Sequence, residues 1–197
     1  KDFLVKTNGK YGIVAKDTTI KVRTVYDDIQ IMDNQNGLYL VRLNNSYGVL
    51  DLDGNTLIEP MYQQIGIGNI SNYSQNGIES QYIILDELIP IKNNNLWGFF
   101  NLQGEQITEF QFTQIGSNKT NVTNSYQVLT VPSYKIVIVQ KDGYYNLMQI
   151  DGKEIIGNYA LDSVYMLSNT ATGENTFYMT YGGKTENIEE WLAGLGF

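Results

Sequence analysis

The residues that could do chemistry in this sequence are carboxylates, amides and tyrosines, because it contains no histidine and no cysteine. The chain therefore lacks the commonest general base, the commonest transition-metal ligand and a thiol nucleophile. A Ser-His-Asp triad, a disulfide and a thiolate metal site are excluded. We also expect no cofactor.

Three pairs of adjacent acidic residues are candidates for acid–base chemistry: Asp27-Asp28, Asp86-Glu87 and Glu189-Glu190. A glycosidase needs two carboxyl groups that face each other across a cleft, about 5 to 9.5 Å apart. Neighbours on a strand point to opposite faces, so none of these pairs builds that geometry alone. We predict a protein that is not an enzyme, with a hydrolase that uses only carboxylates as an alternative.

The segment Asp51-Leu52-Asp53-Gly54-Asn55 begins like a calcium-binding loop. An EF-hand would place its glycine two positions after Gly54 and a glutamate where Tyr62 stands. We interpret the segment as a hairpin turn that carries surface acids, and we predict no metal site.

Tyrosine is the abundant residue with recognition chemistry, since the chain has 15 of them. A tyrosine brings a large contact area and a hydroxyl group at a low entropic cost, as recognition surfaces require. The alternative is that these side chains are half-buried anchors of their loops. The candidate binding residues are the loop tyrosines Tyr73, Tyr82, Tyr126 and Tyr134.

Composition and charge limit the class of protein. A hydrophobic content of 42% and a charged content of 17% predict a globular chain. The net charge of −8 opposes non-specific binding to nucleic acid and docking on an anionic membrane. No apolar run approaches the ~20 residues that span a bilayer, so we expect no membrane insertion. The chain starts at Lys1, so we interpret it as a mature or trimmed fragment, which is compatible with a removed export signal.

An internal repeat supplies the elements that must position these residues. Each copy contains four parts in order: a turn made of Asn, Gly, Lys, Ser or Asp, an aromatic-glycine pair, an apolar run, and an Asp-Gly or Gln-Gly turn. Copy one has Asp17-Thr18 in place of the second turn, and copy four has one extra residue before Leu161. The pairs are Tyr11-Gly12, Tyr47-Gly48, Trp97-Gly98 and, with the glycine replaced, Tyr145-Asn146.

This pattern resembles the WG repeats, which are found mostly in bacterial proteins, in four degenerate copies over most of residues 8–165. The resemblance implies a β-repeat architecture and almost no chemistry. We expect Trp97 and its tyrosine equivalents to pack in the core; the alternative is a row of platforms that stack on sugars.

The expected fold is all-β. Alternation along residues 97–102 puts Trp97 and Phe99 on one face and Gly98 and Phe100 on the other. We expect one continuous domain with repeats at about 1–35, 36–85, 86–134 and 135–165. Residues 166–197 should hold a last strand and a short helix, started by Thr185, that covers the end of the stack. An open array of antiparallel hairpin repeats is favoured over a small four-bladed propeller.

We therefore predict a non-enzymatic interaction module, extracellular or in the bacterial cell envelope, that contacts a protein. The Asn- and Thr-rich insertions between repeats, such as residues 116–127, are where binding residues are most easily placed. The alternatives are a module for cell-wall or host glycans and an intracellular repeat scaffold. A common exposed groove lined by Trp97, Tyr47 and Tyr11 would favour glycans, whereas their burial would disfavour them.

Overall fold

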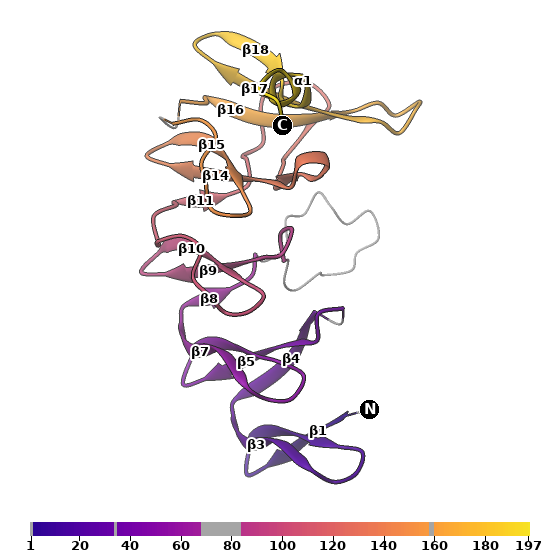
Figure 1. Ribbon diagram of the computed structural model, residues 1–197, viewed down its shortest axis with the longest axis vertical. Coiled ribbons are helices and arrows are strands. Elements are labelled where there is room, and N and C mark those ends of the chain that lie inside the picture. The colour runs from indigo at the N-terminus through magenta and orange to yellow at the C-terminus, as the bar shows by residue number, and fades with distance from the viewer. Residues whose placement is uncertain (1, 34, 68–83, 158–159) are drawn as a thin grey trace.

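The computed structural model describes residues 2–33, 35–67, 84–157 and 160–197. Five small antiparallel sheets follow one another along the chain and stack into an elongated, open array (Figure 1). This confirms the predicted all-β repeat array; the sheets do not close into a propeller. The α-helix among the described residues is seven residues long and cannot cross a membrane.

The strands group into five sheets, here lettered A to E in chain order. Sheet A contains β1 (Asp2–Thr7), β2 (Lys10–Ala15) and β3 (Ile20–Tyr26). Sheet B contains β4 (Asp28–Asp33), β5 (Leu38–Leu43), β6 (Ser46–Leu50) and β7 (Thr56–Tyr62). Sheet C contains β8 (Gln64–Ile65), β9 (Leu88–Asn93) and β10 (Leu96–Asn101).

Sheet D contains β11 (Gln114–Ile115), β13 (Thr130–Val131), β14 (Ile136–Lys141) and β15 (Tyr144–Gln149). Sheet E contains β12 (Ser125–Tyr126), β16 (Ser163–Ser168), β17 (Asn175–Tyr181) and β18 (Lys184–Asn187). A short 3₁₀ turn, η1 (Pro132–Tyr134), precedes β14, and α1 (Ile188–Gly194) ends the chain.

A two-residue turn joins the two long hairpin strands of each sheet. Both residues of the Asn44-Asn45 turn have positive φ, 51° and 66°, and the Asn94-Asn95 turn does the same. Asparagine, aspartate and glycine tolerate this left-handed conformation, which matches the twist of the flanking strands. The turns predicted before the aromatic-glycine pairs are confirmed, and Gly182-Gly183 forms the corresponding turn in sheet E.

Side chains alternate along the central strands, so an inner sheet packs against the sheet before it and the sheet after it. On β14, Ile136 and Ile138 lie in the cluster shared with sheet E, whereas Val137 and Val139 lie in the cluster shared with sheet C. The core is therefore a series of four clusters between consecutive sheets. The predicted split of residues 97–102 between two faces is confirmed.

In each of sheets B to E, three residues at the same positions relative to the two-residue turn face the preceding sheet. We call these three residues the docking set, because they pack against that sheet. Sheet E keeps this spacing although Thr185-Glu186 stands where the aromatic-glycine pair would be. From sheet B to sheet E the sets are Tyr39, Val41 and Leu50; Ile89, Ile91 and Phe100; Val137, Val139 and Met148; and Phe177, Met179 and Ile188.

Glycine is required where backbones approach closely. A Cβ on Gly48 would lie 2.6 Å from the carbonyl oxygen of Ile58, where β7 bulges past β6. A Cβ on Gly104 would lie 2.3 Å from the carbonyl oxygen of Leu57, which belongs to the preceding sheet. The second glycine of the repeat therefore serves the stacking of one sheet on the next as well as its own turn.

At the position of the first repeat glycine, sheet D has an asparagine, whose amide side chain bonds to the neighbouring backbone. Asn146 replaces the glycine and is fully buried. Its side-chain oxygen accepts a hydrogen bond from the Ile156 N–H at 3.0 Å, and its amide nitrogen donates to the Ile156 carbonyl. The extra residue before Leu161 is confirmed, because Tyr145 pairs with a residue 16 positions later, whereas Tyr47 pairs with Tyr62.

One residue at each junction ties a unit to the turn of the next. The Asp27 N–H donates to the Arg42 carbonyl at 2.8 Å, and its carboxylate accepts from Lys10 Nζ at 2.5 Å and the Asn44 N–H at 2.7 Å. Asp27 thus has a structural role at this junction. Corresponding side-chain bonds join Gln63 to the Asn95 N–H and Asp162 to the Gly182 N–H.

The C-terminal helix starts later than we predicted. Thr185 lies in β18 and pairs with Thr180, because the Gly182-Gly183 turn extends β17 into a hairpin. Asn187 is the N-cap: its side-chain oxygen accepts from the Glu189 N–H at 2.9 Å. The assignment of the cap to Thr185 was wrong. Ile188 is buried in the cluster between sheets D and E.

The contact between sheets can be tested with two alanine substitutions. Gly104 and Gly143 have nearly the same backbone, φ 83° and 86°, but a Cβ on Gly143 would meet nothing within 4 Å. Gly143→Ala should therefore lower the free energy of unfolding only by the strain of an alanine in the left-handed conformation, about 1–2 kcal/mol. Gly104→Ala should lower the free energy of unfolding by about 1–3 kcal/mol more, because its methyl group overpacks against Leu57. Urea unfolding measures both; equal losses would contradict the inter-sheet contact.

The junction at Asp27 predicts a pH dependence. The hydrogen bond from Lys10, followed by that from the Asn44 N–H, lowers the pKa of this carboxyl below its usual value. Its contribution to stability is present above the unfolded pKa, about 4, and is lost as the pH falls through the lower folded value. Asp27→Asn should lower stability at neutral pH and weaken the acid dependence of unfolding. Asp142→Asn, in an exposed turn, is the matched control for the loss of an aspartate charge, and equal effects of the two substitutions would contradict the role of the junction.

Candidate functional site

The tyrosines predicted to bind a partner lie apart in the structure. Tyr126 is on β12, pairs with Met166 and is 38% exposed. Tyr134 is in η1 and donates its hydroxyl to the Glu189 carbonyl at 3.2 Å, which connects η1 to α1. Tyr73 and Tyr82 lie outside the described residues. Tyr126 is therefore available for contact, whereas Tyr134 has an anchoring contact of its own.

The aromatic residues of the repeat belong to the core. Trp97 is 8% exposed and Tyr145 is 4% exposed. Tyr11 and Tyr47 are half-buried and pack against two different inter-sheet clusters. These four side chains do not line a common exposed groove, so they do not form the row of sugar platforms that we considered.

An open polar groove lies where the loop of residues 117–127 meets sheets D and E. We call it the loop groove; its volume is about 670 Å³. One wall is the loop segment Asn118–Val122, which is rich in amides and hydroxyls. The other lining residues come from sheet D and from the start of sheet E, namely Gln140, Gly143, Tyr145, Asp162, Ser163 and Thr180.

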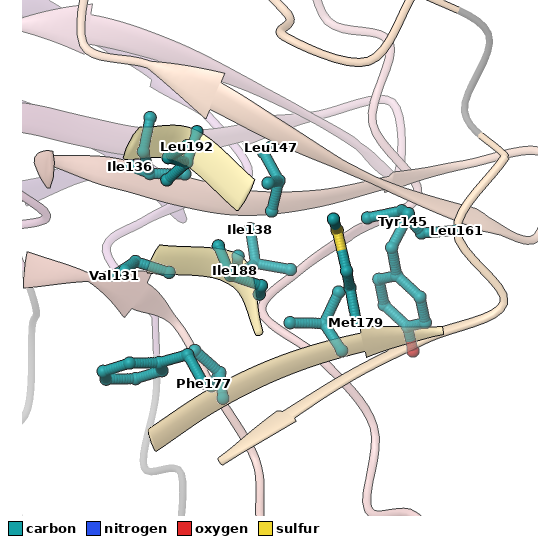
Figure 2. Close-up of a cluster of buried hydrophobic side chains, with 12 residues drawn as sticks. Val131, Ile136, Ile138, Tyr145, Leu147, Leu161, Phe177, Met179, Ile188 and Leu192 are labelled. Atoms are coloured by element: carbon teal, nitrogen blue, oxygen red, sulfur yellow. The ribbon is translucent and has the colours of Figure 1, made fainter. Parts of the chain in front are cut away.

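Tyr145 connects this groove to the core. Figure 2 shows its ring close to Leu161 and Met179, within the cluster between sheets D and E. Its hydroxyl accepts a hydrogen bond from the Asn118 N–H at 3.0 Å. The side chain thus connects the first residue of the loop wall to the buried cluster between sheets D and E.

The loop is held at both ends. The Ser117 N–H donates to the Val128 carbonyl at 2.7 Å, and the Val128 N–H donates to the Ser117 hydroxyl at 2.8 Å. Ser117 is buried, and Ser125 begins the short strand that pairs with β16. The groove wall is therefore positioned before any ligand arrives, which lowers the entropy cost of binding.

The chemistry of the loop groove is hydrogen bonding by neutral groups. The hydroxyls of Ser163 and Thr180 lie 2.6 Å apart. Asp162 is the one carboxylate among the described lining residues, and it accepts from the Gly182 N–H at 3.1 Å. Lys119, on the opposite wall, is the one cation in that lining. Such a surface fits extended polypeptide backbone or sugar hydroxyls.

The other candidate chemical groups have structural partners. Asp51 accepts from the Asp53 and Asn55 N–H groups at 2.9 and 2.8 Å. Asn101 makes the equivalent bonds in sheet C, to the Gln103 and Glu105 N–H groups, so the calcium-like segment is a repeated turn. Among the described residues no three carboxylates gather as metal ligands.

The acidic pair at Asp86-Glu87 forms a tight turn in which both residues have positive φ. Burial raises the pKa of the Asp86 carboxyl above its usual value. Glu87 Oε1 lies 3.0 Å from Lys135 Nζ, an exposed ion pair that joins this turn to the segment after η1. Asp86 and Glu87 therefore form a turn in which Asp86 is half-buried and Glu87 is exposed.

Sequence reasoning pointed to the loop that forms one wall of the groove, but the predicted residues Tyr126 and Tyr134 do not line it. The insertion at residues 116–127 was expected to carry function, and its Asn118 and Asn121 line the groove. Gln140, Asp162 and Ser163 were missed. They follow no local motif and come together only because sheets D and E stack, so spacing along the chain contains no signal for them.

Comparison with known proteins agrees with the repeat. The family of WG-containing repeats matches residues 47–72 and 97–121, and both matches start at an aromatic-glycine pair. No curated protein matches the sequence. A chain in an S. cerevisiae structure of dbp5 bound to nup159, gle1, ip6 and adp is similar with a TM-score of 0.29 and 10% identity. That alignment covers 83% of this chain and 43% of the yeast-structure chain. The two matched segments support a WG-type β-repeat module.

The anchor of the groove wall can be tested at one atom. Tyr145→Phe keeps the ring in the core but leaves the Asn118 N–H without its acceptor, which should cost about 1–2 kcal/mol. Hydrogen exchange at the Asn118 amide should accelerate. Tyr144→Phe, at an exposed neighbouring position, is the control and should change stability by less than about 0.5 kcal/mol. Unchanged exchange in Tyr145→Phe would show that the hydroxyl does not hold the loop.

Proposed function

We propose that this protein is a non-enzymatic β-repeat module that binds a segment of another protein in the loop groove. The observation that carries the proposal is a wall of pre-positioned amides and hydroxyls, Asn118–Val122, beside a stacked-sheet core. We further propose that the described sheets A to D correspond to four WG-type copies, and that sheet E is a fifth, divergent unit.

A protein segment suits this groove because its lining supplies donors and acceptors in similar measure. Asn118, Asn121 and Gln140 each carry both an N–H donor and a carbonyl acceptor, as a peptide backbone does. The groove is open rather than enclosed, so an extended chain can lie along it. Lys119 on one wall and Asp162 on the other allow an orienting contact at each side.

Several features support a role without catalysis. The chain has no histidine or cysteine, and the groove lining includes one carboxylate, which already accepts a hydrogen bond from the Gly182 N–H. Hydrolysis of a glycoside uses two carboxyl groups in defined positions. The three acidic pairs of the sequence lie at a junction, in a tight turn and at a helix start.

A carbohydrate ligand is the second candidate, favoured by one observation. Tyr144, the residue that follows Gly143 of the groove lining, is 49% exposed, so an aromatic side chain is available close in sequence to the groove. Sugars are bound by such combinations of a ring face and hydrogen-bonding side chains. This version of the glycan hypothesis does not need the buried aromatics of the repeat.

We also propose that the protein works outside the cytoplasm, in the bacterial envelope or beyond it. The absence of cysteine and the resemblance to repeats found mostly in bacteria support this setting. Fractionation of the source cells tests it: the protein should appear with the envelope or the medium, and recovery in the cytosolic fraction would contradict it.

Binding to arrays of short peptides and of glycans tests the proposed function. Peptides that bind should lose at least tenfold in affinity to Asn121→Arg, which places a bulky cation in the groove wall. Asn175→Arg, an exposed change outside the lining residues, is the matched control. Glycan binding with the same sensitivity would replace the protein proposal with the carbohydrate one. Binding that ignores Asn121→Arg would refute the groove.

A further inference from the structure

Two positions of the repeat that hold a cation in earlier sheets hold a neutral residue in sheet D, beside the loop groove. The first is the residue that pairs with the repeat aromatic across the hairpin. It is Lys6 in sheet A, Arg42 in sheet B and Lys92 in sheet C. In sheet D it is Gln140, which pairs with Tyr145 and lines the groove. Sheet D is therefore the copy in which this cation is missing.

The second position is found by comparing two junctions. Asp27 and Asp162 stand at the same place in their copies, because each directly follows the residue that pairs with the repeat aromatic. Each carboxylate accepts a hydrogen bond from the turn of the next sheet, from the Asn44 N–H at 2.7 Å and the Gly182 N–H at 3.1 Å. Asp27 is also paired with Lys10, at 2.5 Å. The chain thus neutralises the aspartate at the first junction.

At the second junction the lysine is absent. Tyr144 occupies the place of Lys10, since each residue begins its strand directly before the repeat aromatic. Lys141 pairs with Tyr144 across the hairpin, but its ammonium group donates to the Gln111 side chain at 3.1 Å. Among the described residues no ion pair includes Asp162, which is exposed at the groove. A cation from another molecule can therefore take the position that Lys10 takes beside its aspartate.

The surroundings of Asp162 suit a basic side chain. Tyr144 is 49% exposed, and a cation is attracted to the face of a tyrosine ring. The chain itself makes this contact in sheet A, where Lys6 Nζ lies 4.6 Å from the ring centroid of Tyr11. The net charge of −8 attracts a basic segment from a distance. Lys119 on the loop wall opposes a run of cations, so a single basic residue fits best.

We infer that Asp162 and Tyr144 bind a lysine or arginine side chain of the partner segment, as Asp27 binds Lys10. The inference rests on the proposed function and adds the chemistry of the partner: an extended segment with one basic residue that enters the loop groove. Arginine matches the site more closely than lysine, because its planar guanidinium can bond to a carboxylate and stack on a ring.

The probes for this inference are the array peptides whose binding is lost in Asn121→Arg. Replacing their basic residue by glutamine should lower the affinity at least tenfold. Tyr144→Lys should lower the affinity of the unaltered peptide to a similar degree, because the new lysine neutralises Asp162 as Lys10 neutralises Asp27. The same substitution should change the affinity of the glutamine peptide by less than about twofold. Asp162→Asn removes the charge but keeps an acceptor for the Gly182 N–H, and it should also weaken the unaltered peptide.

Met61→Lys is the matched control, because it adds the same charge at a 64% exposed residue of sheet B. It should change the affinity of either peptide by less than about twofold. Peptides that are sensitive to Asn121→Arg but keep their affinity for Tyr144→Lys would overturn this inference and leave the proposed function standing. An array with no peptide sensitive to Asn121→Arg would refute the groove and the inference together. Circular dichroism confirms that each variant is folded.

Discussion

The structure depends on the close approach of the glycine in the second turn of the inner repeats, at Gly54, Gly104 and Gly152, to the backbone of the preceding unit. A Cβ on Gly54 would lie 2.5 Å from the Lys21 carbonyl oxygen, and Gly104 stands in the same relation to Leu57. A single repeat sheet cannot bury its apolar faces alone and needs the sheets on either side of it. Because these glycines let one sheet settle on the next, each inner sheet can bury both faces, and the core becomes a chain of nearest-neighbour contacts.

This constraint decides where function can lie. The aromatic-glycine pairs and the hairpin turns are used by stacking, so they are not free to vary for a ligand. The residues between repeat units are not used in the stacking in this way. In the insertion after β11, Ser117 and Tyr145 fasten the two ends of a wall whose outer side chains remain available. Loops held by a packed scaffold are a common place for binding residues, which supports the proposed role in recognition.

Local patterns in the sequence were sufficient for the architecture but not for the site. Period-two alternation along residues 97–102 and the turn residues Asn44-Asn45 predict strands and hairpins, because both effects act within a few residues. The start of the C-terminal helix was misplaced since Thr185 is a good cap in isolation, yet the preceding turn commits it to a strand. The loop groove combines Asn118 with Asp162, which only tertiary stacking brings together.

The two ends of such an array cannot be equally stable. Sheet E gains an extra layer of contact, because Ile188 and Leu192 of α1 join its cluster and Tyr134 bonds to the helix. Sheet A has a single neighbour, and its aliphatic residues Ile20 and Val25 remain in water. In a nearest-neighbour system the unit with the fewest contacts opens first, and among the described sheets that unit is sheet A.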